Sequence, residues 1–274
     1  MKPPRNNKPG LRRRIASIVA AVSRLANQAR RLSVTHPTIR IRRLPPAWDG
    51  LRIAHLSDLH AGGMVSLAFL RKVIRSSNAA SPDICVLTGD FVDDPSLIGP
   101  ELTGTLRGLH AREGLFAVLG NHDYDIDAAA VRSALLAAGI RILTNSYQIL
   151  QRQGARLCLA GVDDFWHDPA SAESILRGVD SAVPRILLCH NPDYAQTIRP
   201  RRVDLMLCGH THGGQIKLPL LPPPIARIRY RKYVAGLRRS PACPVYTSRG
   251  VGVSGLPFRF NCPPELPIIT LRRG

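Results

Sequence analysis

The sequence predicts an α/β fold of layered sheets and helices. Short apolar runs typical of strands alternate with helix-like stretches along most of the 274 residues, and this alternation is typical of sheets covered by helices. Hydrophobic residues make up 45% of the chain and charged residues 21%, a balance that argues against a disordered protein. A chain of this length forms one large domain or two small ones.

The elements follow in chain order after a proline-punctuated junction at Pro37, Pro45 and Pro46. We therefore expect an N-terminal segment at 1–46 and a domain at 47–274. Apolar runs predict strands at 51–57, 84–88, 115–119, 140–143, 147–151, 156–162, 185–189, 203–208, 245–248 and 266–271. Helices are expected at 66–77, 97–110, 127–138 and 171–177. The proline-rich stretch 218–224 cannot form a regular element, and a basic stretch with Tyr230 and Tyr233 among its cations follows at 227–239.

The charge of the chain is strongly positive and unevenly placed. The net charge is +19, from 38 Lys and Arg against 19 Asp and Glu. Residues 1–43 carry 12 of these cations and no acid. The excess charge therefore belongs mainly to the N-terminal segment and favours an anionic partner there.

The N-terminal segment has the pattern of a basic amphipathic helix over residues 11–32. Its apolar stripe consists of Leu11, Ile15, Ile18, Val22, Leu25, Ala29 and Leu32. Such a helix can lie on an anionic membrane surface; a solubilising tail and a helix packed on its own domain are the alternatives. Arg12-Arg13 resembles a twin-arginine export signal, but a convincing cleavage site does not follow. A cytoplasmic location, peripheral on the inner membrane, is favoured over export. No apolar run is long enough for a membrane-spanning helix.

The six cysteines lack any C-x-x-C spacing, and four of them lie in strand-like apolar runs. This pattern predicts buried, reduced thiols. It argues against a disulfide framework and against a zinc–thiolate site.

Polar residues with metal-binding side chains follow five of the apolar runs. They are Asp58 and His60, Asp90 and Asp93, Asn121, His122 and Asp123, His190, and His210 and His212. Ligands of open α/β sheets bind outside the carboxyl ends of strands, so these ends are expected to converge. Imidazole and carboxylate donors suit Zn, Fe or Mn. Two of the Asp, four of the His and Asn121 are the expected donors. These seven are too many for one tetrahedral ion and suit two ions that share a carboxylate.

Taken together, these motifs resemble the motif set of the calcineurin-like metallophosphoesterases. The matching motifs are Asp58-x-His60, Gly89-Asp90-x-x-Asp93, Gly120-Asn121-His122-Asp123, His190 and Gly209-His210-x-His212. Further pieces at 189–193, 209–215 and 248–262 are similar to the bacterial YkuE-like branch of that family. The resemblance covers about residues 50–272 and implies a four-layer α/β/β/α sandwich, in which two mixed β-sheets are flanked by helices.

The resemblance also implies roles for single residues. Asp58, His60 and His212 would bind one divalent metal ion, and Asn121, His190 and His210 the second. Asp90 would bridge the two. His122 would meet the scissile phosphate and protonate the leaving oxygen, with Asp123 orienting its imidazole, and a hydroxide between the metals would be the nucleophile. Asp93 is expected to support the site without binding metal. Arg249 and Arg259 lie on loops that approach the site, and their role stays open.

The implied activity is that of a dinuclear metal-dependent phosphoric ester hydrolase, a phosphodiesterase or pyrophosphatase. A lipid-linked or nucleotide-sugar substrate, such as UDP-diacylglucosamine, fits a site held at a membrane. A nuclease and a soluble phosphomonoesterase are the alternatives. Nucleic acid is not favoured because only 5% of residues are aromatic. A non-catalytic basic tether would not need the complete donor set.

Overall fold

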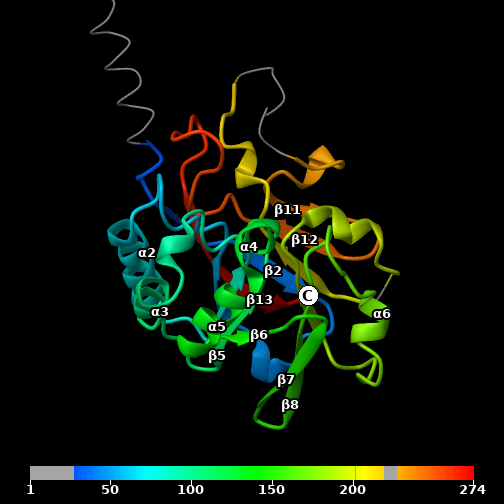
Figure 1. The fold of residues 1–274 in the computed structure, drawn as a ribbon. Helices are drawn as coiled ribbons and strands as arrows, with labels where there is room; N and C mark the ends of the chain where they lie inside the picture. Colours follow the sequence, from blue (N-terminus) through cyan, green and yellow to red (C-terminus); the bar gives the residue numbers. More distant parts are fainter. Residues whose placement is uncertain (1–27, 201, 219–226) are drawn as a thin grey trace, which may run out of the picture.

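Two β-sheets pack face to face in the computed structural model, which describes residues 28–200, 202–218 and 227–274 (Figure 1). The first sheet has the strand order β1-β13-β3-β4-β5-β6, and β2 also pairs with β13. Its strands are β1 (Ser33–Thr35), β2 (Thr38–Ile41), β3 (Arg52–Leu56), β4 (Ile84–Thr88), β5 (Gly114–Val118), β6 (Arg141–Ile142) and β13 (Glu265–Arg273). The sheet is mixed, because β13 runs antiparallel to β3 while β3, β4 and β5 are mutually parallel.

The second sheet has the order β11-β12-β10-β9-β8-β7. Its strands are β7 (Ser146–Arg152), β8 (Ala155–Gly161), β9 (Arg185–Leu188), β10 (Leu205–Cys208), β11 (Gly236–Arg239) and β12 (Pro244–Thr247). The central strands β8, β9, β10 and β12 are parallel, and an antiparallel strand lies at each edge. Both sheets are therefore mixed, as predicted.

Alternate residues of the central strands enter different cores, which produces the four layers. Ile84 and Val86 of β4 lie between the sheets, whereas Cys85 and Leu87 face the outer helices. Strand β9 repeats this pattern in the second sheet, with Ile186 packing between the sheets. Because both faces of these strands are buried, their sequences are continuous apolar runs.

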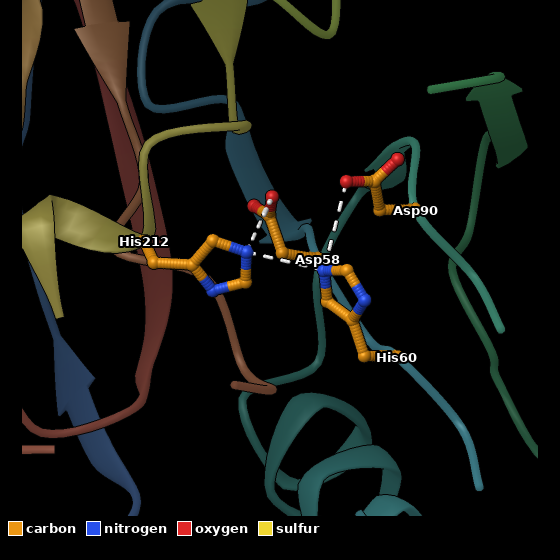
Figure 2. A group of neighbouring side chains, drawn as sticks. All are labelled: Asp58, His60, Asp90 and His212. Atoms are coloured by element: carbon orange, nitrogen blue, oxygen red, sulfur yellow. Dashed lines mark hydrogen bonds and ion pairs between the residues drawn. The ribbon is translucent and has the colours of Figure 1, made fainter. Parts of the chain in front are cut away.

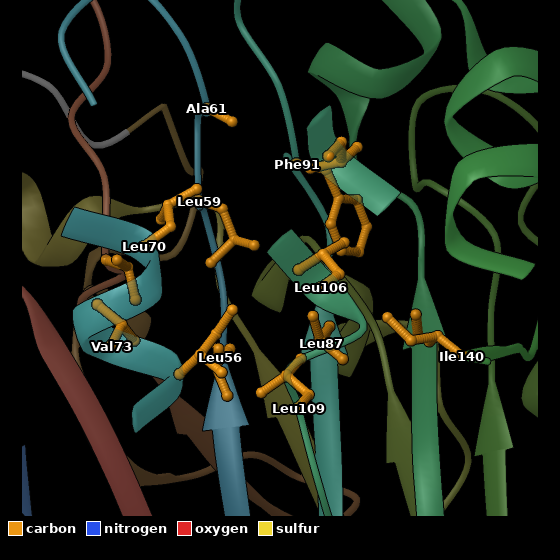
Figure 3. Packing of buried hydrophobic residues seen from close by; sticks show 14 of the residues in the cluster. Leu56, Leu59, Ala61, Leu70, Val73, Leu87, Phe91, Leu106, Leu109 and Ile140 are labelled. Atoms are coloured by element: carbon orange, nitrogen blue, oxygen red, sulfur yellow. The ribbon is translucent and has the colours of Figure 1, made fainter. Parts of the chain in front are cut away.

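Helices cover the outer face of each sheet. On the first sheet lie α2 (Leu67–Ala79), α3 (Pro100–Leu106) and α5 (Ala128–Ala137), whose side chains form one apolar cluster with Leu56, Leu87 and Phe91 (Figure 3). The short α4 (Asn121–Ile126) directly follows the loop after β5. On the second sheet, the short α6 (Ala172–Ile175) and two 3₁₀ turns, Pro192–Gln196 and Arg231–Tyr233, form a thinner layer. The predicted four-layer α/β/β/α sandwich is thus confirmed.

The main differences from the sequence prediction lie at the N-terminus and in short elements. β1 and β2 pair with β13, so the first sheet includes residues on the N-terminal side of the boundary predicted at residue 47. Strand β11 and helix α4 were not predicted, and the helices expected at 97–110 and 171–177 are shorter in the structure. Most of the predicted amphipathic segment, Arg12 and Arg13 included, lies outside the described residues.

Two further sequence predictions concern membranes and cysteines. Among the residues that the structure describes, none forms a helix long and apolar enough to cross a membrane. All six cysteines are buried and free, as the lack of a paired spacing predicts.

Candidate metal centre

The predicted donor residues meet where strands of both sheets end. Asp58 and His60 follow β3, Asp90 follows β4, and Asn121 begins α4 after β5. The second sheet contributes His190 after β9, and His210 and His212 after β10. His60 and His212 are 152 residues apart in the chain, yet their Nε2 atoms are 3.1 Å apart. The site therefore depends on the packing of the two sheets against each other.

The backbone at these positions adopts an unusual conformation. Five donor residues have positive φ angles between 47° and 70°: Asp58, His60, Asp90, His210 and His212. Residues other than glycine rarely adopt this left-handed region. Strain of this kind concentrates at functional sites, where the surrounding structure enforces it.

Close packing explains why a glycine, Gly209, precedes His210. A Cβ atom on Gly209 would lie 1.7 Å from Ser57 Oγ and 2.5 Å from Asp58 Oδ2. Gly209 is therefore required by the close approach of β10 to β3.

One group of donors consists of Asp58, His60, Asp90 and His212, all buried (Figure 2). His60 Nε2 lies 3.5 Å from Asp90 Oδ2, and His212 Nε2 lies 3.6 Å from Asp58 Oδ1. One donor atom from each residue falls within 4.8 Å of every other. Such a spacing allows all four to reach one ion.

A second group consists of Asp90, His190 and His210. His190 Nε2 lies 3.1 Å from Asp90 Oδ2 and 3.1 Å from His210 Nδ1. Asp90 is thus common to both groups. Asn121 Oδ1 and Asp58 Oδ2 are buried and have no hydrogen-bond partner in the described part of the chain. Buried oxygens without partners are costly unless a ligand satisfies them.

The hydrogen bonds of the outer imidazole nitrogens fix which nitrogens face inward. His60 Nδ1 pairs with Asp93 Oδ1 at 2.6 Å, His190 Nδ1 with the Thr88 carbonyl at 2.7 Å, and His210 Nε2 with the Arg227 carbonyl at 3.2 Å. These nitrogens donate, so the inner nitrogens carry lone pairs.

The inner nitrogens of His190 and His210 lie 3.1 Å apart, and that of His190 is also 3.1 Å from Asp90 Oδ2. Imidazoles that are anchored on an oxygen through their outer nitrogen are the usual arrangement of metal ligands. The residues therefore fit a pair of metal ions.

The charges of the carboxyl groups follow from their neighbours. Burial alone would raise the pKa of Asp90, but His190 and His60 hold it well below its usual range. Burial raises the pKa of Asp58. Asp90 is thus ionised, which suits a carboxylate common to both donor groups.

His122 lies at the edge of the donor cluster. The carboxylate next to its imidazole is that of Asp93, whereas Asp123 was expected there. Asp93 Oδ1 is 3.4 Å from His122 Nδ1. Asp123, expected to orient the imidazole, is fully buried and accepts the backbone N–H groups of Gly120, Asp90 and Phe91. The expectation for Asp123 is therefore corrected, because α4 directs its side chain back onto the β4 loop. Asp123 braces the backbone of Asp90, and burial raises the pKa of Asp123 to about 7.

Contact with the Asp93 carboxylate also determines the charge of His122. It raises the pKa of His122 to about 9. His122 is therefore an imidazolium at neutral pH. Its side chain is about one-third exposed, and it lines the cavity over the donors, which has a volume of about 460 Å³.

The structure shows the contacts of Arg249 and Arg259, whose role the sequence left open. Arg259 is fully buried and donates to the carbonyls of Gly252, His212 and Cys262. It ties the C-terminal loop to the segment that carries His212. Arg249 pairs with Glu265 at 3.1 Å. Both side chains thus have protein partners.

Sequence reasoning missed two residues beside the donors, Trp166 and Arg227. The Trp166 ring lies edge-on to His210, with centroids 4.8 Å apart, and Arg227 lines the cavity over the donors. Both lie in irregular segments outside the strand-end motifs. The basic stretch around Arg227 was the only signal.

The family model for calcineurin-like phosphoesterases matches residues 51–214, which include every predicted donor. The chain belongs to this family. It is 34% identical to the metallophosphoesterase YkuE of Bacillus subtilis, over 88% of this chain and 86% of that protein. It is 35% identical to the phosphodiesterase YaeI of Escherichia coli, over 80% and 82%.

A third relative is the UDP-2,3-diacylglucosamine pyrophosphatase LpxG of Chlamydia trachomatis, which is 31% identical over 79% of this chain and 82% of that protein. Among solved structures, the 5′-nucleotidase precursor of Thermus thermophilus has a TM-score of 0.50 at 14% identity. That match covers 80% of this chain and 54% of the nucleotidase, and it supports the fold alone. This chain is accordingly a metallophosphoesterase with the family's sandwich.

Proposed function

We propose that this protein hydrolyses a phosphodiester or pyrophosphate bond with two divalent cations. The observation that carries the proposal is the pair of donor groups that share Asp90. Asp58, His60 and His212 would hold one ion, Asn121, His190 and His210 the other, and Asp90 would bridge them. The nitrogen and oxygen donors suit Mn²⁺, Fe²⁺ or Zn²⁺. Such ions lower the pKa of a bound water and stabilise the charge of phosphoryl oxygens.

His122 is the residue suited to protonate the leaving oxygen. It lines the cavity over the donors, and its contact with Asp93 keeps it protonated at neutral pH. A positioned imidazolium next to a phosphate can donate its proton as the bond to the leaving group breaks. Asp93 acts through His122 and His60, because its Oδ1 atom contacts both imidazoles.

The substrate that we favour is a lipid-linked or nucleotide-sugar pyrophosphate, such as UDP-diacylglucosamine. The names of the relatives LpxG and YaeI support diester or pyrophosphate cleavage. A nuclease, a soluble phosphomonoesterase and a non-catalytic basic tether remain the alternatives.

Hydrolysis of bis-p-nitrophenyl phosphate by metal-stripped protein, with Mn²⁺, Fe²⁺ or Zn²⁺ restored, tests the activity. We expect metal-dependent turnover that Asp90→Asn abolishes together with at least one bound ion, because the neutral amide no longer neutralises two cations. Asp180→Asn is the matched control, since the Asp180 carboxylate is exposed and pairs with the exposed Arg156. Absence of turnover with two ions bound, or full metal occupancy in Asp90→Asn, would overturn the assignment.

We also propose that residues 11–32 hold the protein on an anionic membrane, peripheral to its cytoplasmic face. The 12 cations of residues 1–43 support this proposal. A deletion that tests it must spare β1 and β2, so it removes residues 1–27 only. The full chain should sediment with anionic vesicles and the truncated chain should stay in the supernatant. Equal sedimentation of both would exclude this segment as the anchor.

A further inference from the structure

A second cavity adjoins the metal centre and has no role in the proposed chemistry. Its volume is about 520 Å³. Its walls include three aromatic rings, two arginines, an amide and one carboxylate: Phe165, Trp166, Tyr230, Arg227, Arg229, Gln196 and Asp193. Arg227 lines both this cavity and the one over the metal donors. The two cavities are therefore neighbours that share Arg227.

One wall presents an exposed aromatic ring, that of Trp166. Trp166 is half-exposed, although it is one of only two tryptophans in the chain. Its backbone N–H donates to Asp164 Oδ1 at 3.0 Å, and Asp164 is fully buried. The same oxygen pairs with His167 Nδ1 at 2.9 Å. The backbone that carries the exposed ring is therefore anchored on a buried carboxylate, and the ring itself packs edge-on against His210.

The backbone of the wall segment that carries Arg229 and Tyr230 is held by Asp193. Its carboxylate accepts the N–H groups of Arg229 at 2.6 Å and Tyr230 at 3.0 Å. The Arg229 guanidinium lies 5.7 Å from the Tyr230 ring centroid. Among the described residues, neither Arg227 nor Arg229 has a carboxylate partner within 4.0 Å. Their charges are thus free to meet an anion.

These groups select a flat, aromatic, phosphate-bearing ligand. Exposed Trp and Tyr rings and guanidinium planes stack on nucleobases, whereas an acyl chain gains little from two cations and an amide. We propose that this cavity binds the nucleobase of a nucleotide substrate, with Arg227 contacting the phosphate between the base and the metal centre. The proposal rests on the proposed function for the position of the scissile phosphate.

Binding can be measured without turnover, by the fluorescence of Trp166 in metal-stripped protein. The other tryptophan, Trp48, is buried between the sheets. A change in emission when a ligand enters the cavity therefore comes from Trp166. Thymidine 5′-monophosphate should quench the emission, and ribose 5-phosphate, which lacks the base, should not. Trp166→Leu should abolish the quenching. Equal responses to both ligands would overturn the proposal.

Turnover of two diesters with the same leaving group gives an independent measurement. We expect the holoenzyme to prefer thymidine 5′-p-nitrophenyl phosphate over methyl p-nitrophenyl phosphate. Trp166→Leu should reduce that preference, the ratio of the two kcat/KM values, roughly tenfold, the loss expected from one base stack. Trp166→Phe should restore much of it. Tyr147→Leu, which removes an exposed ring on β7, is the matched control.

The outcomes separate the two proposals. Quenching by the nucleotide without turnover of either ester would contradict the proposed function and leave the base site intact. A different result would contradict the base site alone: both esters are hydrolysed, each with the same kcat/KM in wild type and Trp166→Leu, and the nucleotide does not quench the fluorescence. UDP-N-acetylglucosamine and the dinucleotide TpT, used as competitors, distinguish a nucleotide-sugar from a nucleic-acid strand as the source of the base.

Discussion

At the scale of single residues, the donors are placed by strained backbone as well as by side-chain chemistry. Five of them occupy the left-handed region, at a cost of roughly 1–3 kcal/mol for each residue. Asp123 offsets part of that cost at Asp90, because it accepts the N–H of Asp90 and of the next residue. Asp123 therefore helps to hold the backbone at Asp90, and a substitution of Asp123 should alter the position of the Asp90 carboxylate.

The pH dependence of activity should report on the His122–Asp93 pair. The pKa of His122 is raised to about 9, so the imidazolium form that donates a proton prevails below that pH and is lost above it. We expect kcat/KM to fall as the pH rises through about 9. In Asp93→Asn the descending limb should shift towards about 6.5, the ordinary pKa of histidine. Metal analysis of the same samples checks that both ions stay bound.

His122→Ala completes this test. It should keep its metal but lose activity by roughly 10²–10⁴-fold, as for removal of a general acid. The loss should be larger with diphenyl phosphate than with bis-p-nitrophenyl phosphate, because phenolate is the more basic leaving group and needs the proton more. An unchanged rate with both diesters would remove His122 from the mechanism.

At the scale of elements, the buried central strands could be predicted from the sequence, whereas β2 and β11, which carry exposed cations, could not. β4 matches its predicted bounds, β9 is one residue shorter at its C-terminal end, and β3 is one residue shorter at each end. These strands are predictable because two buried faces give a continuous apolar run. β2 alternates buried Ile39 and Ile41 with exposed Arg40, and its cations made it resemble a charged tail. β11 is an edge strand inside the basic stretch, and α4 is too short to show a helical period.

The metal donors could be predicted from the sequence, whereas the contacts around them could not. The donors could be predicted because each follows a recognisable strand end. The pairing of Asp93 with His122 depends on how the chain after β4 folds back, and the burial of Arg259 depends on a loop without periodic structure. Neither relationship is encoded in local sequence pattern.

Strand β2 provides a test of where the folded domain begins. Ile39 is 1% exposed and packs in the core between the sheets. Ile39→Ala should lower the free energy of unfolding by about 2–5 kcal/mol, measured by urea denaturation. Arg40→Ala, on the exposed face of the same strand, should change it by less than about 0.5 kcal/mol. Equal, small effects would mean that residues before 47 add little to the domain.

At the scale of the whole molecule, the inter-sheet core joins the two halves of the metal centre. β3, β4 and β5 bring one set of donors and β9 and β10 the other. Their relative position is set by the apolar layer between the sheets. Metal affinity and global stability are therefore coupled, since a site assembled only in the folded state stabilises that state when it binds.

His55 makes this core sensitive to acid. It lies on β3, fully buried, with Nε2 2.9 Å from Thr88 Oγ1 and its ring 6.3 Å from that of Tyr246 on the other sheet. Burial lowers its pKa to about 3, so the folded protein keeps His55 neutral while the unfolded chain takes up a proton below about 6.5. The unfolded state then binds more protons, and stability falls as the pH drops from about 6.5 towards 3.

The variant His55→Gln keeps a polar group for Thr88 but cannot titrate. Between pH 7 and pH 5, the metal-free wild type should lose about 2 kcal/mol more unfolding free energy than this variant. Denaturant titrations at the two pH values, with chelator present, measure this difference and remove the contribution of metal release. If both proteins lose the same amount, acid must act on the sandwich elsewhere, and the inter-sheet core would be held together independently of the charge state of His55.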